Sequence, residues 1–170
     1  MHPPGYAVYI TFGIKRLPMN STVFLTIVSG VLTFVIGQIF VKLVIEPVHE
    51  LKKTLGQISH ALIEYANVIT NPGVPSKEVI EQASKHLRGL SSQLQAHLYL
   101  VPFYAVTARI FFLPSEQKVR KASTSLIGLS NSLSIPTQGI YEENVRRVES
   151  VCDALGIFMA ESDRWSKECL

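Results

Sequence analysis

The sequence predicts an all-α protein in which one N-terminal transmembrane helix, kinked near Pro47, continues into an up-and-down cytoplasmic bundle of about four helices. An uncharged apolar run near the N-terminus, apolar stripes at three- and four-residue spacing after it, and short connections rich in proline and glycine predict this fold. Charged residues make up 17% of the 170 residues, against roughly 25% in ordinary soluble domains. We therefore divide the chain into a short disordered tail (1–21), a transmembrane helix (22–45) and a cytoplasmic helical bundle (46–170).

The transmembrane prediction depends on the run from Val23 to Val41, which holds 19 residues without a charge. At ~1.5 Å per residue it covers about 28 Å, close to the roughly 30 Å hydrocarbon core of a bilayer. The helix extends to Ile45 because Lys42 can reach the headgroups. The alternative is a hydrophobic helix buried in a hairpin. A cleaved signal peptide fits poorly, since no small-residue cleavage site follows the run.

The orientation follows from the basic residues that flank the run. Three lysines follow it and two basic residues precede it: Lys42, Lys52 and Lys53 against Lys15 and Arg16. If translation starts at Met19, the count becomes three against none. The positive-inside rule then places the bundle in the cytoplasm of a single-pass protein of the cell membrane.

Small residues lie at close helical spacing within the span. This predicted packing face consists of Ser29, Gly30, Thr33, Gly37 and Gln38. Small residues four apart let two helices approach closely, and a glutamine amide can hydrogen-bond across the contact. The alternative is that glycine and serine are simply common in transmembrane helices.

One apolar stripe crosses the end of the span without changing phase and continues to Ile69. We therefore expect one helix over roughly residues 22–70, bent where Pro47 removes a backbone donor. The segment 70–75, TNPGVP, ends this helix, and Ser76 is placed to cap the next one.

Three further stripes predict the other helices of the bundle. Their members are Ile80, Ala83, Leu87, Leu90, Leu94, His97 and Val101; Val119, Ala122, Leu126, Leu129 and Leu133; and Val145, Val148, Cys152, Leu155 and Met159. Two apolar positions in seven suit a coiled-coil-like seam, and short connections make neighbouring helices antiparallel.

The aromatic segment 98–113, LYLVPFYAVTARIFFL, has three interpretations. It forms part of the bundle core, an apolar surface for a bilayer or a partner protein, or a second span, for which it is short. Pro102 is expected to kink its helix. If the segment is exposed, the candidate membrane or partner anchor is Phe103, Tyr104, Phe111 and Phe112, because aromatic side chains dominate interface energetics.

The sequence contains no recognisable catalytic, cofactor or metal motif. Glu46-x-x-His49 is a single copy of a pattern that di-iron bundles need twice. The pairs His49/His60 and His86/His97 are each 11 residues apart, about 16 Å along a helix, which is too far for one metal ion.

The serine-rich stretch 121–134 has no base nearby in sequence. Cys152 and Cys169 are expected to be free thiols, and a net charge of +3 does not indicate a nucleic-acid partner.

The leading hypothesis is a non-enzymatic membrane protein without cofactors that acts by association, as a scaffold, an accessory subunit or a sensor module. Its expected partners are the lipid bilayer and either further copies of itself, as a homo-oligomer, or another membrane protein. One alternative is an oligomerising effector that perturbs the bilayer. A less favoured alternative is a membrane-bound enzyme that uses 98–113 as an apolar pocket.

Overall fold

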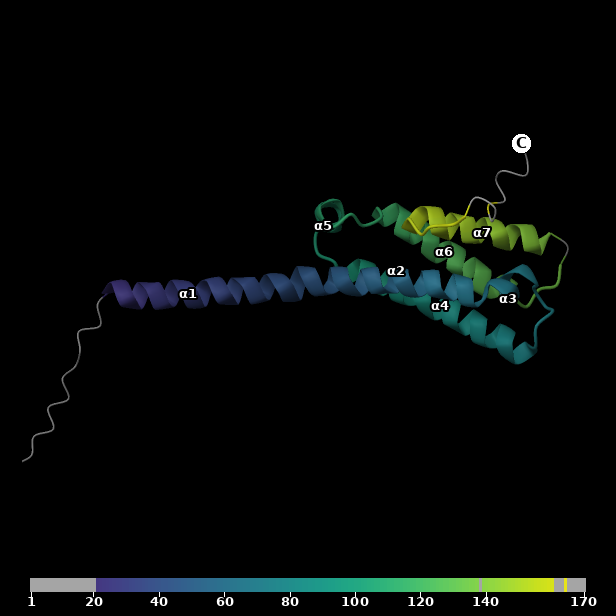
Figure 1. The fold of residues 1–170 in the computed structure, drawn as a ribbon, viewed down its shortest axis with the longest axis horizontal. Coiled ribbons are helices and arrows are strands. Elements are labelled where there is room, and N and C mark those ends of the chain that lie inside the picture. Colours follow the sequence, from purple (N-terminus) through teal and green to yellow (C-terminus); the bar gives the residue numbers. More distant parts are fainter. Residues whose placement is uncertain (1–20, 138, 161–163, 165–170) are drawn as a thin grey trace, which may run out of the picture. The chain divides into compact units, whose positions relative to one another are not determined.

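The described part of the chain, residues 21–137, 139–160 and 164 of a computed structural model, is helical and contains no strand (Figure 1). It divides into two compact units, with the boundary between Gln38 and Ile39. The prediction of an all-helical protein with one long apolar N-terminal helix is confirmed. Residues 1–20 and Cys169 lie outside the described residues, and with them the alternative start at Met19 and the flanking charges Lys15 and Arg16.

The first unit contains α1 (Ser21–Phe40), none of whose residues is buried. The hydroxyl groups of Thr26, Ser29 and Thr33 bond to the helix's own backbone. Thr26 donates to the Thr22 carbonyl and Thr33 to the Ser29 carbonyl, each at 2.9 Å, and Ser29 donates to the Thr26 carbonyl at 2.9 Å. These three side chains therefore need no water to satisfy them, which is the condition for placing such residues in an apolar medium.

A π-helical turn, η1 (Val41–Ile45), separates α1 from α2 (Glu46–Glu64). The Glu46 amide donates to the Val41 carbonyl, five residues back. Pro47 follows in the first turn of α2. A proline ring crowds the carbonyl four residues before it and cannot donate to it. We attribute the wider turn to Pro47, because a π-turn just before it relieves this crowding.

The long helix ends earlier than the sequence predicts. The α2 helix ends at Glu64, Tyr65 adopts φ −97° and ψ 14°, and a separate turn of helix, α3, covers Ala66–Thr70. The irregularity is local, since the Tyr65 amide still bonds to the Ala61 carbonyl and the Tyr65 carbonyl accepts from Ile69. The Tyr65 ring is buried against α4, where its hydroxyl lies 3.2 Å from Nδ1 of His86. This contact accounts for the break.

The second unit is a helical bundle built from α2, α4 (Lys77–Leu100), α6 (Glu116–Ser132) and α7 (Ile140–Leu155). The α4 helix packs against α2 and α6, and α6 packs against α7. Successive long helices run in opposite directions (Figure 1). Ser76 caps α4 as expected, because its hydroxyl accepts from the Val79 amide at 3.5 Å.

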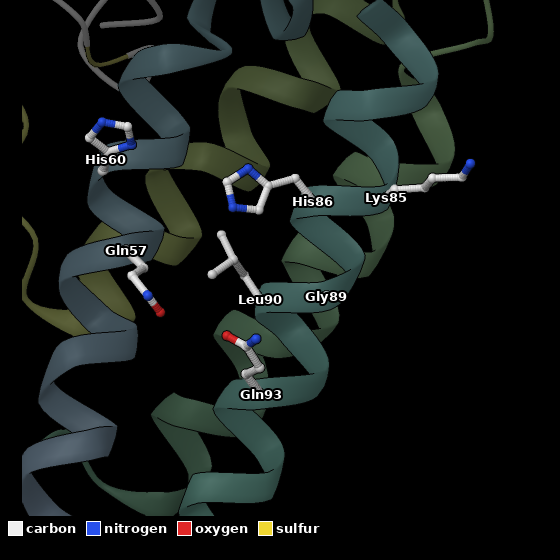
Figure 2. A pocket seen from close by; sticks show the side chains of 7 residues that line it. All are labelled: Gln57, His60, Lys85, His86, Gly89, Leu90 and Gln93. Atoms are coloured by element: carbon white, nitrogen blue, oxygen red, sulfur yellow. The ribbon is translucent and has the colours of Figure 1, made fainter. Parts of the chain in front are cut away.

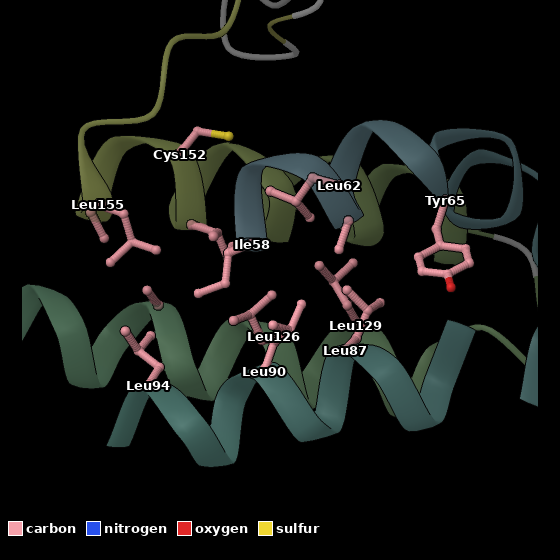
Figure 3. Packing of buried hydrophobic residues seen from close by; sticks show 14 of the residues in the cluster. Ile58, Leu62, Tyr65, Leu87, Leu90, Leu94, Leu126, Leu129, Cys152 and Leu155 are labelled. Carbon is pink, nitrogen blue, oxygen red and sulfur yellow. The ribbon is translucent and has the colours of Figure 1, made fainter. Parts of the chain in front are cut away.

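The core of the bundle follows the predicted stripes closely on α4 and α6 (Figure 3). All five stripe positions of α6 are fully buried: Val119, Ala122, Leu126, Leu129 and Leu133. The stripe predicted on α7 is wrong in part, since Val145 and Val148 are only half-buried while Asn144 and Val151 are completely buried. Cys152 and Leu155 are buried as predicted, but a polar residue, Asn144, takes the first inward position of α7.

Candidate functional site: an exposed aromatic turn and a histidine groove

The aromatic segment 98–113 is not one helix. The α4 helix ends at Leu100, a turn contains Pro102, and a seven-residue helix, α5 (Tyr104–Ile110), follows. Pro102 therefore lies between two helices and does not kink one. Neither helical piece of this segment is long enough to cross a bilayer.

The four predicted anchor residues divide into two pairs. Phe103 is 87% exposed and Phe112 92% exposed, whereas Tyr104 and Phe111 are half-buried and pack against the bundle core. The Tyr104 hydroxyl donates to the Pro114 carbonyl at 2.7 Å. Burial, with a smaller contribution from the nearby Glu116 carboxylate, raises the Tyr104 pKa to about 12. Part of the segment therefore packs against the core, and part of it is exposed.

The two exposed phenylalanines have unfavourable backbone geometry. Phe103 has φ 46° and Phe112 has φ 54°, and they are the two non-glycine residues with positive φ in the described chain. For a residue with a Cβ this left-handed region costs roughly 1–2 kcal/mol. These rings are therefore held outward by strained turns on either side of α5, without packing inside the chain in return.

A shallow groove of about 470 Å³ lies between α2 and α4 (Figure 2). Its lining is mostly polar: Gln57, His60, Lys85, His86, Gly89, Leu90 and Gln93. Both histidines already have partners. His86 meets Tyr65 edge to face at 5.6 Å, and Nδ1 of His60 lies 3.6 Å from the Glu64 carboxylate. Within residues 21–137, 139–160 and 164, no three His, Cys, Asp or Glu side chains lie close enough to hold a metal ion.

The serine-rich stretch serves helix packing. The Ser123 hydroxyl lies 2.7 Å from the Ser91 hydroxyl and accepts from the Gln95 amide at 2.7 Å, which joins α6 to α4. Ser84 donates to the Ser130 carbonyl at 2.6 Å across the same interface. Small hydroxyl side chains let these two helices pack closely while satisfying each other. None of these contacts supplies a base that would activate a serine.

Cys152, His97 and the two glycines of the predicted packing face, all singled out in the sequence, differ in burial and in their neighbours. Cys152 is a buried free thiol. Burial, followed by the neighbouring Asp153 charge, raises the pKa of this thiol to about 11. His97 is half-buried, with Nδ1 2.8 Å from the Thr54 hydroxyl. On α1, a Cβ added at Gly30 or Gly37 would meet no other atom within 4 Å. Among the described residues, the predicted packing face is thus unobstructed at both glycines.

Asn144 is the structurally important residue that the pattern of the sequence does not reveal. It is fully buried, its amide donates to the Ile69 carbonyl at 3.1 Å, and its Oδ1 accepts from the Ser132 hydroxyl. It therefore links α3, α6 and α7. The only sign of its burial in the sequence is its position one residue before the predicted α7 stripe. Asparagine is mostly exposed in proteins, so a hydrophobic pattern places it on the surface.

No protein-family model matches the chain, and neither the curated proteins nor the solved structures contain a significant match.

Proposed function

We propose that the chain is a single-pass protein of the cell membrane with its helical bundle in the cytoplasm. The bundle acts by association, as a scaffold, an accessory subunit or a sensor module, with no catalysis of its own. The observation that carries the proposal is the composition of α1. This helix has no buried residue and no charge, and it belongs to an unbroken helical stretch of 44 residues from Ser21 to Glu64.

The exposed side chains of α1 support the membrane part of the proposal. Phe34 is 66% exposed, Ile36 65% and Leu25 63%, and every turn of the helix contributes similar residues. Soluble proteins rarely expose a continuous apolar surface of this extent. A bilayer removes this surface from water, and the hydroxyls that bond to the helix backbone are compatible with lipid on all sides.

A carbonate wash of native membranes tests the anchor. We expect the chain to remain in the membrane pellet, as integral proteins do. Val31→Asp with Phe34→Asp should move it to the supernatant, since each aspartate at the centre of a span costs about 2.5–3.5 kcal/mol on insertion scales. Ile63→Asp, at an exposed site in α2, is the matched control and should not change the partition. A wild-type chain found in the supernatant would contradict the proposal.

Association is supported by the open small-residue face of α1 and by the Gln38 amide. Among the described residues, no hydrogen-bond partner for Gln38 is found, and an unpaired amide in an apolar medium is unfavourable. A second helix at this face would supply a partner. Crosslinking in native membranes distinguishes self-association from a foreign subunit. Failure to recover any crosslinked species would remove the support for association.

The alternative function, an oligomerising effector that perturbs the bilayer, is favoured by the exposed rings of Phe103 and Phe112. Dye leakage from vesicles that contain the reconstituted chain tests it. Phe103→Asp with Phe112→Asp should abolish leakage, and Val74→Asp, at an exposed site in another loop, should not. A wild-type chain that leaves vesicles sealed would exclude this alternative.

A further inference from the structure

The α5 helix exposes apolar side chains to solvent and turns its hydroxyl groups toward the bundle. Its two hydroxyl groups point inward, since the Thr107 hydroxyl donates to the Pro102 carbonyl at 2.8 Å and the Tyr104 hydroxyl to the Pro114 carbonyl. Its outward face carries Val106 and Ile110, one helical turn apart and 62% and 63% exposed. A surface helix of a water-soluble protein buries its apolar side chains and leaves its polar ones in solvent.

The apolar surface extends beyond α5 into the turns at both of its ends. The contributing residues are Tyr99, Leu100, Phe103, Val106, Ile110 and Phe112, each at least 61% exposed. We call this set the α5 patch. Scattered exposed apolar residues are normal, but six within 14 positions, two of them in strained backbone, require a partner that removes them from water.

The position of α5 identifies that partner. The helix connects the C-terminal end of α4 to the N-terminal end of α6, and both ends lie where α2 begins (Figure 1). Residues 39–45 enter the bundle at this same end. Under the proposed function these residues leave the bilayer here, with Lys42 as the first charge after the apolar run. Connectivity therefore brings a membrane surface to the end of the bundle that holds the α5 patch.

The charge on the outer surface of α5 fits a lipid surface as well. Arg109 is exposed and follows Val106 on the solvent side, and no ion pair or hydrogen bond to it is found among the described residues. Lys42, also exposed, lies at the same end of the bundle and pairs with Glu46 at 2.9 Å. Basic residues beside inserted apolar rings are typical of helices that lie in the interface of a bilayer with anionic lipid.

From these observations, and resting on the proposed function, we infer that the α5 patch is a second, interfacial membrane contact. Phe103, Val106, Ile110 and Phe112 lie in the headgroup and acyl boundary of the leaflet through which the chain emerges, with Arg109 at the phosphates. The contact fixes the bundle against the membrane at two points, the span and α5. It also accounts for the outward rings, since burial in lipid offsets the exposure and the strained turns.

Tryptophan quenching in the full-length chain tests the inference. The chain has one tryptophan, Trp165, and Trp165→Phe provides a silent background. Single tryptophans are then introduced by Phe34→Trp in α1, Phe103→Trp and Phe112→Trp in the α5 patch, and Val74→Trp as an exposed control in the loop after α3. Each protein is reconstituted into vesicles of phosphatidylcholine and phosphatidylglycerol, with and without bromine on the acyl chains.

We expect brominated lipid to lower the emission of the Phe34→Trp, Phe103→Trp and Phe112→Trp variants by about twofold or more, because interfacial helices bury their apolar face about 5–10 Å deep. The Val74→Trp variant should keep its emission. Both phenylalanines are nearly fully exposed, so tryptophan replaces them without repacking the core.

The other outcomes overturn distinct parts of the account. Quenching of Phe34→Trp alone would leave the anchor intact and overturn the interfacial contact, with a protein partner then covering the α5 patch. Quenching of all four variants would overturn the assignment of the contact to the α5 patch, because Val74 lies outside that patch. An unquenched Phe34→Trp variant would overturn the proposed function together with this inference.

Discussion

Replacing Asn144 with alanine should destabilise the bundle far more than its place on a mostly polar helix suggests. The Asn144 amide is fully buried and donates to the Ile69 carbonyl at 3.1 Å. Alanine leaves that carbonyl buried and unpaired, at a cost of about 1–3 kcal/mol. The Ser132 hydroxyl loses less, because it can still donate to the Leu129 carbonyl at 3.0 Å. With about 1 kcal/mol for the vacated volume, the free energy of unfolding should fall by about 2–4 kcal/mol.

The buried thiol of Cys152 provides the assay. In a Cys169→Ser background, the full-length chain in detergent is unfolded with urea, and thiol labelling of Cys152 reports the unfolded fraction. Asn131→Ala is the matched control, since Asn131 is exposed on α6 and accepts a hydrogen bond from Arg88. We expect this control to lose less than about 1 kcal/mol. Equal losses for the two variants would refute the role assigned to Asn144.

Three further predictions follow from the core, the span and the thiol. Leu126→Ala, at a fully buried position, should lower the free energy of unfolding by about 2–5 kcal/mol in the same assay, and a loss below 1 kcal/mol would contradict the packing described. Gly30→Ile with Gly37→Ile should reduce the crosslinked oligomer in native membranes, because branched side chains keep two helices apart; an unchanged oligomer would exclude that face. The pKa of Cys152 is about 11 in the folded chain against 9 in the unfolded one. This difference favours folding below pH 9, and its contribution to stability should disappear as pH rises from 9 to 11. The Cys152→Ser variant should lack that part of the pH dependence, and identical profiles would contradict it.

The sequence predicts the helices whose apolar residues repeat at three and four positions, because burial of one face imposes that spacing. The α6 stripe from Val119 to Leu133 is buried at every position, and the apolar run of α1 is unmistakable. An irregular turn, η1, precedes Pro47, and its π-helical form depends on hydrogen bonds that no residue pattern encodes.

The parts that the sequence does not predict depend on contacts between distant residues. The break at Tyr65 follows from its contact with His86, 21 positions away, and the burial of Asn144 from the Ile69 carbonyl, 75 positions away. In the aromatic segment, composition identifies Phe103 and Phe112 as candidates. It does not separate them from Tyr104 and Phe111, because the difference arises from two left-handed turns around α5.

Accessibility of single cysteines on the two sides of α1 tests the central claim, that the chain crosses the membrane once with its bundle in the cytoplasm. Ser21→Cys and Lys118→Cys, both at exposed positions, are introduced separately after Cys152→Ser and Cys169→Ser. A membrane-impermeant maleimide is then applied to intact and to permeabilised cells. The account predicts labelling of the Ser21→Cys variant in intact cells and of the Lys118→Cys variant only after permeabilisation. Labelling of the Lys118→Cys variant in intact cells, or protection of both variants until permeabilisation, would contradict it.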